Sequence, residues 1–181
     1  MNKKVLTIFV LLLLAMGFTT LVAAEVQEGK AGKGVPVIAR SFASKEIRGG
    51  DTWKVYLNVS DPDGEMKNIF ALVEQPGVGP YPIGITRIKK ENRRELSGYI
   101  YLNIFTPFSS INSLEFVTLT LTVQVQDRSG NFSQPVVFPL SISSRFVQEK
   151  PPQGVFKEQD LGPIMITLRP IMDGDNNQSY F

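Results

Sequence analysis

The sequence predicts an all-β fold, an antiparallel β-sandwich of about seven strands. Two segments, 52–60 and 116–127, alternate between apolar and polar side chains, which is the period of a strand with one buried face. An acidic turn follows each of them, at 61–64 (Asp-Pro-Asp-Gly) and at 127–131 (Asp-Arg-Ser-Gly-Asn). No apolar repeat of helical period occurs after residue 24. Short strands at this spacing, separated by turns, are typical of a two-sheet sandwich.

The strands of this sandwich follow one another through residues 35–144. The first, 35–42, suits the edge of a sheet, because Pro36 has no N–H to donate to a neighbouring strand. The other strands are expected at 52–60, 68–74, 83–90, 94–104, 116–127 and 133–142. The last of these is also an edge strand, since Pro135 and Pro139 interrupt its row of N–H donors.

The connections between these strands carry their own signals. A charged turn at Glu91 and Asn92 predicts that the strands before and after it pair as a hairpin. Gly98 falls in the inward-facing row of the second strand, which indicates a bulge or the close packing of another segment. The loop at 106–113 carries apolar side chains, as does Phe105 just before it, and we expect it to cap the open end of the core.

Residues 1–24 are typical of a secretory signal peptide. Lys3 and Lys4 precede an apolar stretch at 5–16, and small residues at 22–24 precede Glu25. A retained membrane anchor is the alternative, but the apolar stretch is shorter than the roughly 20 residues that a spanning helix needs. The expected organisation is a cleaved signal peptide at 1–24, a flexible leader at 25–34, the sandwich at 35–144, and a linker with a C-terminal tail at 145–181.

The composition of the 181-residue chain excludes several classes of protein. No cysteine is present, so no disulfide framework holds the domain. No histidine is present either, which excludes histidine-based catalytic triads and the familiar zinc sites. Basic and acidic side chains are equal in number once the two lysines of residues 1–24 are set aside, so the charge gives no reason to expect a nucleic-acid partner. We expect no catalytic activity.

Two segments resemble bacterial immunoglobulin-like domains of cell-surface proteins. They are 53–64 (Trp-x-Val-x-Leu-x-Val-x-Asp-Pro-Asp-Gly) and 123–133 (VQVQDRSGNFS), whose Asp-x-x-Gly-Asn-x-Ser corner precedes the last strand. The resemblance covers about residues 35–143; the chain lacks the cysteine pair of antibody-type domains and the calcium-linker motifs of cadherins. It implies an immunoglobulin-like sandwich in a periplasmic or cell-surface setting, and it implies no ligand.

The two acidic turns are the first candidate site. In an immunoglobulin-like strand order, the segments before them end at the same pole of the sandwich. The side chains of Asp61, Asp63, Asp127 and Asn131 would then converge, and carboxylate and amide oxygens are ligands that Ca²⁺ prefers. The alternative is that these residues only shape their turns, which require Asp, Asn and Gly in any case.

A basic turn is the second candidate. Five cationic side chains cluster there, namely Arg87, Lys89, Lys90, Arg93 and Arg94. Such a patch would contact anionic polymers of the cell envelope. The alternative is a solvated turn whose charge is balanced by Glu91 and Glu95.

Tyrosines form the third candidate. Tyr56, Tyr99 and Tyr101 face outward by alternation, and Tyr81 lies in a loop rich in proline and glycine. Exposed flat rings would offer a stacking platform for a carbohydrate. The alternative is ordinary packing, because tyrosine is common on the outer face of strands.

The C-terminal region contains one further expected element. Residues 148–159 are typical of a linker, and 161–171 are apolar enough to form an extra strand. That strand either folds back on its own domain or adds to the sheet edge of another chain.

These observations favour a non-catalytic, exported structural or adhesive binding module of the cell envelope, periplasmic or extracellular. Its expected partner is another envelope or surface protein or a glycan, with no membrane insertion after signal cleavage. Two alternatives stay open: a carbohydrate-binding module with Ca²⁺ as its only cofactor, and a subunit of a surface assembly that donates its C-terminal strand.

Overall fold

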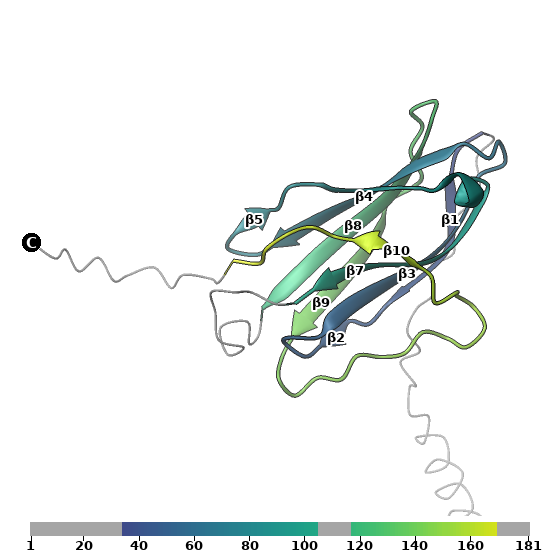
Figure 1. Ribbon diagram of the computed structural model, residues 1–181. Coiled ribbons are helices and arrows are strands. Elements are labelled where there is room, and N and C mark those ends of the chain that lie inside the picture. The colour runs from purple at the N-terminus through teal and green to yellow at the C-terminus, as the bar shows by residue number, and fades with distance from the viewer. Residues whose placement is uncertain (1–33, 105–116, 170–181) are drawn as a thin grey trace, which may run out of the picture.

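The computed structural model describes residues 34–104 and 117–169, and their fold is all-β (Figure 1). A four-stranded sheet has the order β1-β3-β7-β10 and consists of β1 (Val37–Ala43), β3 (Thr52–Ser60), β7 (Glu95–Asn103) and β10 (Asp160–Pro163). A six-stranded sheet has the order β2-β9-β8-β4-β5, with β6 also paired to β4. It consists of β2 (Glu46–Ile47), β4 (Met66–Gln75), β5 (Gly79–Pro80), β6 (Gly84–Arg87), β8 (Thr118–Asp127) and β9 (Val136–Ile142).

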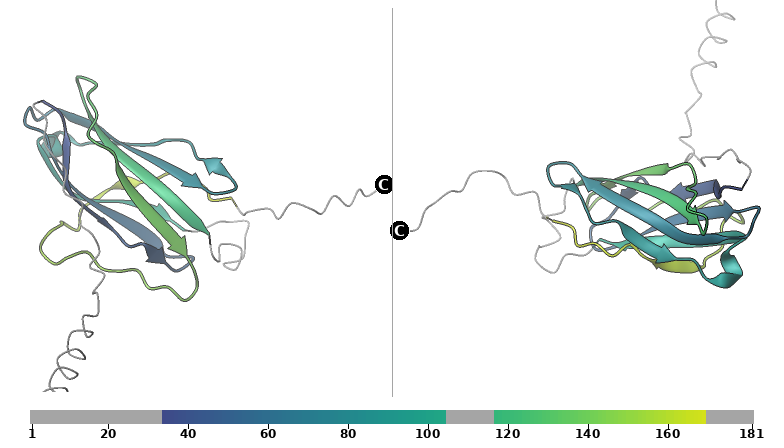
Figure 2. Two further views of the ribbon diagram at one scale, coloured as in Figure 1. Left: turned by 180° about the vertical axis from the view of Figure 1, so that it is seen from behind. Right: turned by 90° about the horizontal axis from the view of Figure 1, so that it is seen from above.

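The two sheets pack face to face around one apolar core (Figure 2). Alternation along β3 and β8 places one face of each strand in this core, and Trp53 and Leu121 are fully buried. The indole Nε1 of Trp53 donates a hydrogen bond to the carbonyl of Ser44 at 2.8 Å, so its one polar atom is satisfied. Each such large apolar side chain contributes about 1.5–3 kcal/mol by leaving water, which makes the core the main source of stability.

Most of the predicted strands are confirmed. The segment 52–60 is β3, 116–127 contains β8, and the predicted edge strand at 35–42 is β1, at the edge of the four-stranded sheet. The predicted edge strand at 133–142 corresponds to β9. Its final residues, Ser141 and Ile142, nevertheless pair in parallel with the short strand β2. Residues 1–33, 105–116 and 170–181 lie outside the described residues, and the capping loop predicted at 106–113 is among them.

The predicted hairpin between 83–90 and 94–104 is wrong. Strand β6 pairs with β4 in one sheet, whereas β7 pairs with β3 in the other. A 3₁₀ turn at Lys90–Asn92 carries the chain across the side of the sandwich, and Ile88 and Leu96 on either side of it are buried in the common core. A hairpin turn and a crossing between sheets use the same charged, solvated residues, so their composition does not distinguish them.

The extra strand predicted at 161–171 is confirmed only at its start, where β10 runs from Asp160 to Pro163, and its partner belongs to the same chain. Strand β10 pairs in parallel with β7, and the amide of Ile164 donates to the carbonyl of Tyr101 at 2.7 Å. Beyond the strand, Ile164 and Leu168 are buried in the core. The tail therefore covers the side of the sandwich between β7 and β6 (Figure 1).

Close packing also explains Gly98. A Cβ at this position would overlap the carbonyl oxygen of Gln159, closer than any real contact permits. The amide of Tyr99 donates to that same carbonyl at 2.9 Å. The sequence prediction of close packing at Gly98 is thus confirmed, and the segment that approaches it is the C-terminal tail.

Candidate functional site

Residues 148–158 form an arch over the outer face of the four-stranded sheet (Figure 1). They contain no helix or strand, as expected of a linker, yet they pack along β3. At the first end of the arch, the side-chain oxygen of Gln148 accepts a hydrogen bond from the Lys54 amide at 3.4 Å. Near the other end, the carbonyl of Val155 accepts one from the Asn58 side chain at 2.8 Å.

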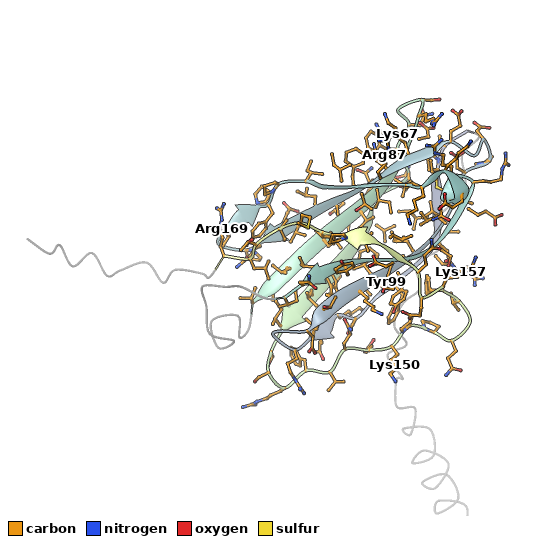
Figure 3. The ribbon with its side chains drawn as sticks, viewed as in Figure 1. Lys67, Arg87, Tyr99, Lys150, Lys157 and Arg169 are labelled. Atoms are coloured by element: carbon orange, nitrogen blue, oxygen red, sulfur yellow. The ribbon has the colours of Figure 1, made fainter. Side chains whose placement is uncertain are left out.

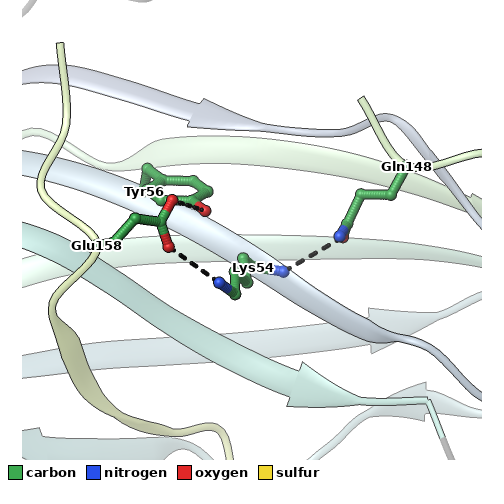
Figure 4. Close-up of polar contacts among 4 residues, drawn as sticks. All are labelled: Lys54, Tyr56, Gln148 and Glu158. Carbon is green, nitrogen blue, oxygen red and sulfur yellow. Dashed lines mark hydrogen bonds and ion pairs between the residues drawn. The ribbon is translucent and has the colours of Figure 1, made fainter. Parts of the chain in front are cut away.

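Glu158 is the main polar contact between the arch and the sheet (Figure 4). Its Oε1 accepts a hydrogen bond from the Tyr56 hydroxyl at 2.7 Å, and its Oε2 pairs with the Lys54 ammonium at 3.0 Å. The hydrogen bond from Tyr56, together with that from Lys54, lowers the pKa of Glu158. The Glu158 carboxylate in turn raises the pKa of Lys54, and burial followed by the same carboxylate raises the pKa of Tyr56. These shifts favour an ionised Glu158, a charged Lys54 and a neutral Tyr56, which are the states that hold the arch against β3.

Aromatic rings continue this contact across the sheet. The Phe156 ring of the arch lies 5.6 Å from that of Tyr56, which lies 5.5 Å from that of Tyr99. Tyr101 extends the row, and the Lys54 ammonium lies 4.2 Å from the centre of the Tyr99 ring. Ring separations of this size are favourable, and a cation over a ring adds to them.

A hollow of about 910 Å³ lies between the arch and β3. Its lining combines polar and aromatic groups, with Lys54, Tyr56, Gln148, Lys150, Gln153, Phe156 and Glu158 among them. Volumes of this order are typical of sites for small molecules or polymer segments, in which a few polar groups fix the orientation of the ligand. Lys150 lies on the arch, within reach of solvent (Figure 3).

The structure places the predicted tyrosines differently from one another. Tyr56, Tyr99 and Tyr101 share the outer face, as predicted, but Tyr56 is only 4% exposed because the arch covers it. The prediction of an exposed ring is wrong for Tyr81, which is buried. Its hydroxyl donates to the Gln75 side chain and accepts from the Arg169 amide at 2.8 Å. Tyr81 thereby holds the C-terminal tail, because a hydroxyl that leaves water needs such partners.

The two acidic turns do lie together, as the predicted strand order requires. The amide of Arg128 in one turn donates to the carbonyl of Glu65 in the other at 3.0 Å. The carboxylate oxygens, however, accept hydrogen bonds within their own turns. Asp61 accepts from the amides of Asp63 and Glu65.

Asp127 behaves in the same way as Asp61. Its carboxylate accepts from both the amide and the side chain of Asn131, at 2.8 Å each. Within residues 34–104 and 117–169, no group of three or more His, Cys, Asp or Glu residues is placed to hold a metal ion. Calcium binding by Asp61, Asp63, Asp127 and Asn131 stays a prediction.

The basic turn divides into two parts. Arg87, Lys89 and Lys90 are exposed, whereas Arg94 packs against Gly64 and donates to the carbonyl of Pro62 at 2.8 Å. The Nε of Arg93 is shielded from solvent and has no hydrogen-bond partner. In the described part of the chain the one ion pair is that of Lys54 and Glu158, so Glu91 and Glu95 form none with the basic turn.

Sequence reasoning did not single out Lys54, Gln148, Phe156 or Glu158. One usable signal is Phe156, an aromatic residue in an otherwise polar segment, since a free linker has no use for a large apolar ring. Alternation also places Lys54 beside Tyr56 on the outer face. The pairing of these groups across about a hundred residues carries no local signal.

No protein-family model matches this sequence, and no curated protein is similar to it. Within the described residues, no helix has the length and apolar character needed to cross a membrane. The candidate sites of this protein are those that the geometry of the arch and of the two outer faces of the sandwich defines.

Proposed function

We propose that this protein is a non-catalytic binding module exported to the cell envelope, with an immunoglobulin-like sandwich as its scaffold. The strand order supports the scaffold. In immunoglobulin domains the first, second and fifth main strands share one sheet, and the third, sixth and seventh share the other. Strands β1, β3 and β7 and strands β4, β8 and β9 are distributed in this way, and β6 takes the place of the additional strand beside the third.

Export is supported by the pattern of residues 1–24. A positive start, an apolar stretch and small residues before Glu25 are the features that the secretion machinery reads. Cell fractionation followed by N-terminal sequencing tests this part. A mature protein that begins at Glu25 in the periplasm or medium is expected, and a full-length protein in the cytoplasm would refute export.

The hollow beneath the arch is the observation that carries the binding function. It combines aromatic rings, amide side chains and an ion pair in a space of about 910 Å³. Sugars present flat apolar faces edged by hydroxyl groups, and they are recognised by rings together with amide and charged side chains. The proposed ligand is thus a segment of an envelope glycan, which the arch holds against β3.

A glycan-binding screen followed by calorimetry tests this proposal. We expect Gln153→Ala and Lys150→Ala to weaken binding about tenfold, because both line the hollow and neither side chain contributes a hydrogen bond that holds the arch. Lys90→Ala is the matched control, since this exposed lysine lies on the basic turn. Equal losses of affinity in Lys150→Ala and Lys90→Ala would show that the glycan is attracted by charge in general and not bound in the hollow. The absence of any glycan binding would refute the proposal.

A further inference from the structure

The outer face of the six-stranded sheet exposes a set of large apolar side chains. Ile85 is 60% exposed, Ile83 56%, Val137 46% and Phe132 43%. Phe70 and Leu72 lie among them, half-buried. We call these six residues the apolar face. Single exposed apolar residues are ordinary, but a contiguous group on a soluble protein usually marks an interaction surface.

Strand pairing makes this group contiguous. Phe70 on β4 lies opposite Ile85 on β6, and its ring lies 5.3 Å from that of Phe132. Thr122 on β8 lies opposite both Leu72 and Val137. Since paired residues of neighbouring strands project to the same side of a sheet, the face extends across four strands, with apolar side chains on β4, β6 and β9 and the uncharged Thr122 of β8 between Leu72 and Val137.

The two outer faces of the sandwich differ in what covers them. The arch and its Phe156 lie over the four-stranded sheet, where Tyr56 is buried as a result. No described residue covers the apolar face in this way, since Ile83 and Ile85 are more than half exposed. Within residues 34–104 and 117–169, one outer face is thus covered by the arch and the other is exposed.

Charge on the apolar face indicates what kind of partner fits. Outward side chains of β8 in its middle are uncharged threonine and glutamine. Arg87 of β6 lies at one end of the apolar face, where it pairs with Asn68 of β4. Lys67 lies beside Arg87 (Figure 3). Glu74 lies at the other end of β4, on the same side as Phe70 and Leu72 by alternation. Glu74 follows Asn68 by six positions along β4, which corresponds to about 20 Å.

A surface with opposite charges at its two ends is complementary to a copy of itself. A twofold axis that lies in the plane of the interface, perpendicular to the strands, turns a second copy over. The two apolar faces then stack on each other, and Arg87 of each copy lies near Glu74 of the partner subunit. We propose that the apolar face is a homodimer interface with this antiparallel arrangement. The inference is independent of the glycan proposed above, because the hollow lies on the opposite sheet.

The size of the face predicts a weak dimer. Four strands about 4.8 Å apart and about 20 Å long present roughly 300 Å² in projection. Interfaces at the small end of the known range form transient complexes. The charge pairs at the rim contribute orientation more than affinity, since they stay partly solvated.

Sedimentation equilibrium of the purified protein, from about 1 to about 300 µM, tests the proposal over the range expected of a weak dimer. We expect reversible dimerisation that Ile85→Glu weakens at least tenfold, because it places a charge among the apolar side chains that the interface buries. Met165→Glu is the matched control. Met165 is also apolar and is 79% exposed, but it lies on the tail, so its substitution should leave the dimer unchanged.

A charge exchange tests the arrangement itself. Arg87→Glu and Glu74→Arg should each weaken the dimer, and the double variant should recover the dissociation constant of the unmodified protein, since each copy then meets the opposite charge again. A protein that stays monomeric throughout the concentration range would overturn the proposal. So would a dimer that Ile85→Glu leaves intact, or a double variant that shows the combined loss of the two single ones.

Discussion

Asp61 and Asp127 each accept two hydrogen bonds within their own turns, and both residues are buried. Asp61 is only 1% exposed, so the amides of Asp63 and Glu65 have no ready replacement for its carboxylate. At the residue scale, these hydrogen bonds give Asp61 and Asp127 a structural role in their turns.

Asp61→Ala should lower the free energy of unfolding by about 2 kcal/mol, because two amides next to a buried position lose their acceptor. Urea denaturation in the presence of a calcium chelator measures this cost without any contribution from a metal. Asp63→Ala is the control, since Asp63 is exposed and should matter by less than about 0.5 kcal/mol. An effect of Asp61→Ala that appears only when calcium is added would contradict the hydrogen-bonding explanation and favour the metal site.

Glu158 should titrate below its usual pKa of 4.5, because Tyr56 and Lys54 donate hydrogen bonds to its carboxylate. A lowered pKa in the folded state means that its contribution to docking of the arch is complete above 4.5 and is lost as the pH falls through the lowered value. Lys54 has the opposite sign: its pKa is raised, so its contribution is complete below 10.5 and is lost as the pH rises through the raised value.

Carboxyl-carbon NMR measures the Glu158 pKa directly. Tyr56→Phe should raise it, because the hydrogen bond from the tyrosine is the largest cause of the shift. Tyr101→Phe removes a hydroxyl from the same face without removing a partner of Glu158, so it serves as the control. An unchanged Glu158 pKa in Tyr56→Phe would show that the arch is not docked in solution.

At the element scale, attachment of the C-terminal tail depends on Gly98 of β7, whose lack of a side chain lets the tail approach closely. Gly98→Ala should destabilise the protein by about 1–3 kcal/mol, since the new methyl group would meet the backbone of Gln159, which cannot rotate away as a side chain could. Gly84→Ala is the matched control in β6, where the nearest atoms lie 3.6 Å from the new Cβ. Urea denaturation of the two variants makes the comparison, and equal stability would mean that the tail does not pack on β7.

The position of most strands could be predicted from the local sequence pattern, but the strand with which each one pairs often could not. Alternation defined β3 and β8 because one face of each strand is buried along its whole length. The pairing of β6 with β4, in contrast, depends on which sheet buries Ile88, and this is decided by packing far away in the sequence. The site shows the same division. The sequence indicated the outward tyrosines, but not the arch that covers them, because contacts such as that of Tyr56 with Glu158 span about a hundred residues.

At the scale of the whole molecule, the sandwich has two unlike outer faces. One is covered by the arch, with a hollow beneath it, and the other carries the apolar face. The glycan site and the dimer interface that we propose lie on opposite sheets, so each can be altered without the other. This arrangement requires that the C-terminal tail of each chain folds onto its own sandwich, because a tail donated to another chain would make the arch an interface between subunits.

The most direct test of this arrangement is an isotope-filtered nuclear Overhauser measurement on labelled and unlabelled protein refolded together in equal amounts. We predict contacts between the rings of Phe156 and Tyr56, 5.6 Å apart, within one chain and none between chains. Ring contacts found only between labelled and unlabelled chains would contradict it and show that the C-terminal strand is donated to a neighbouring molecule.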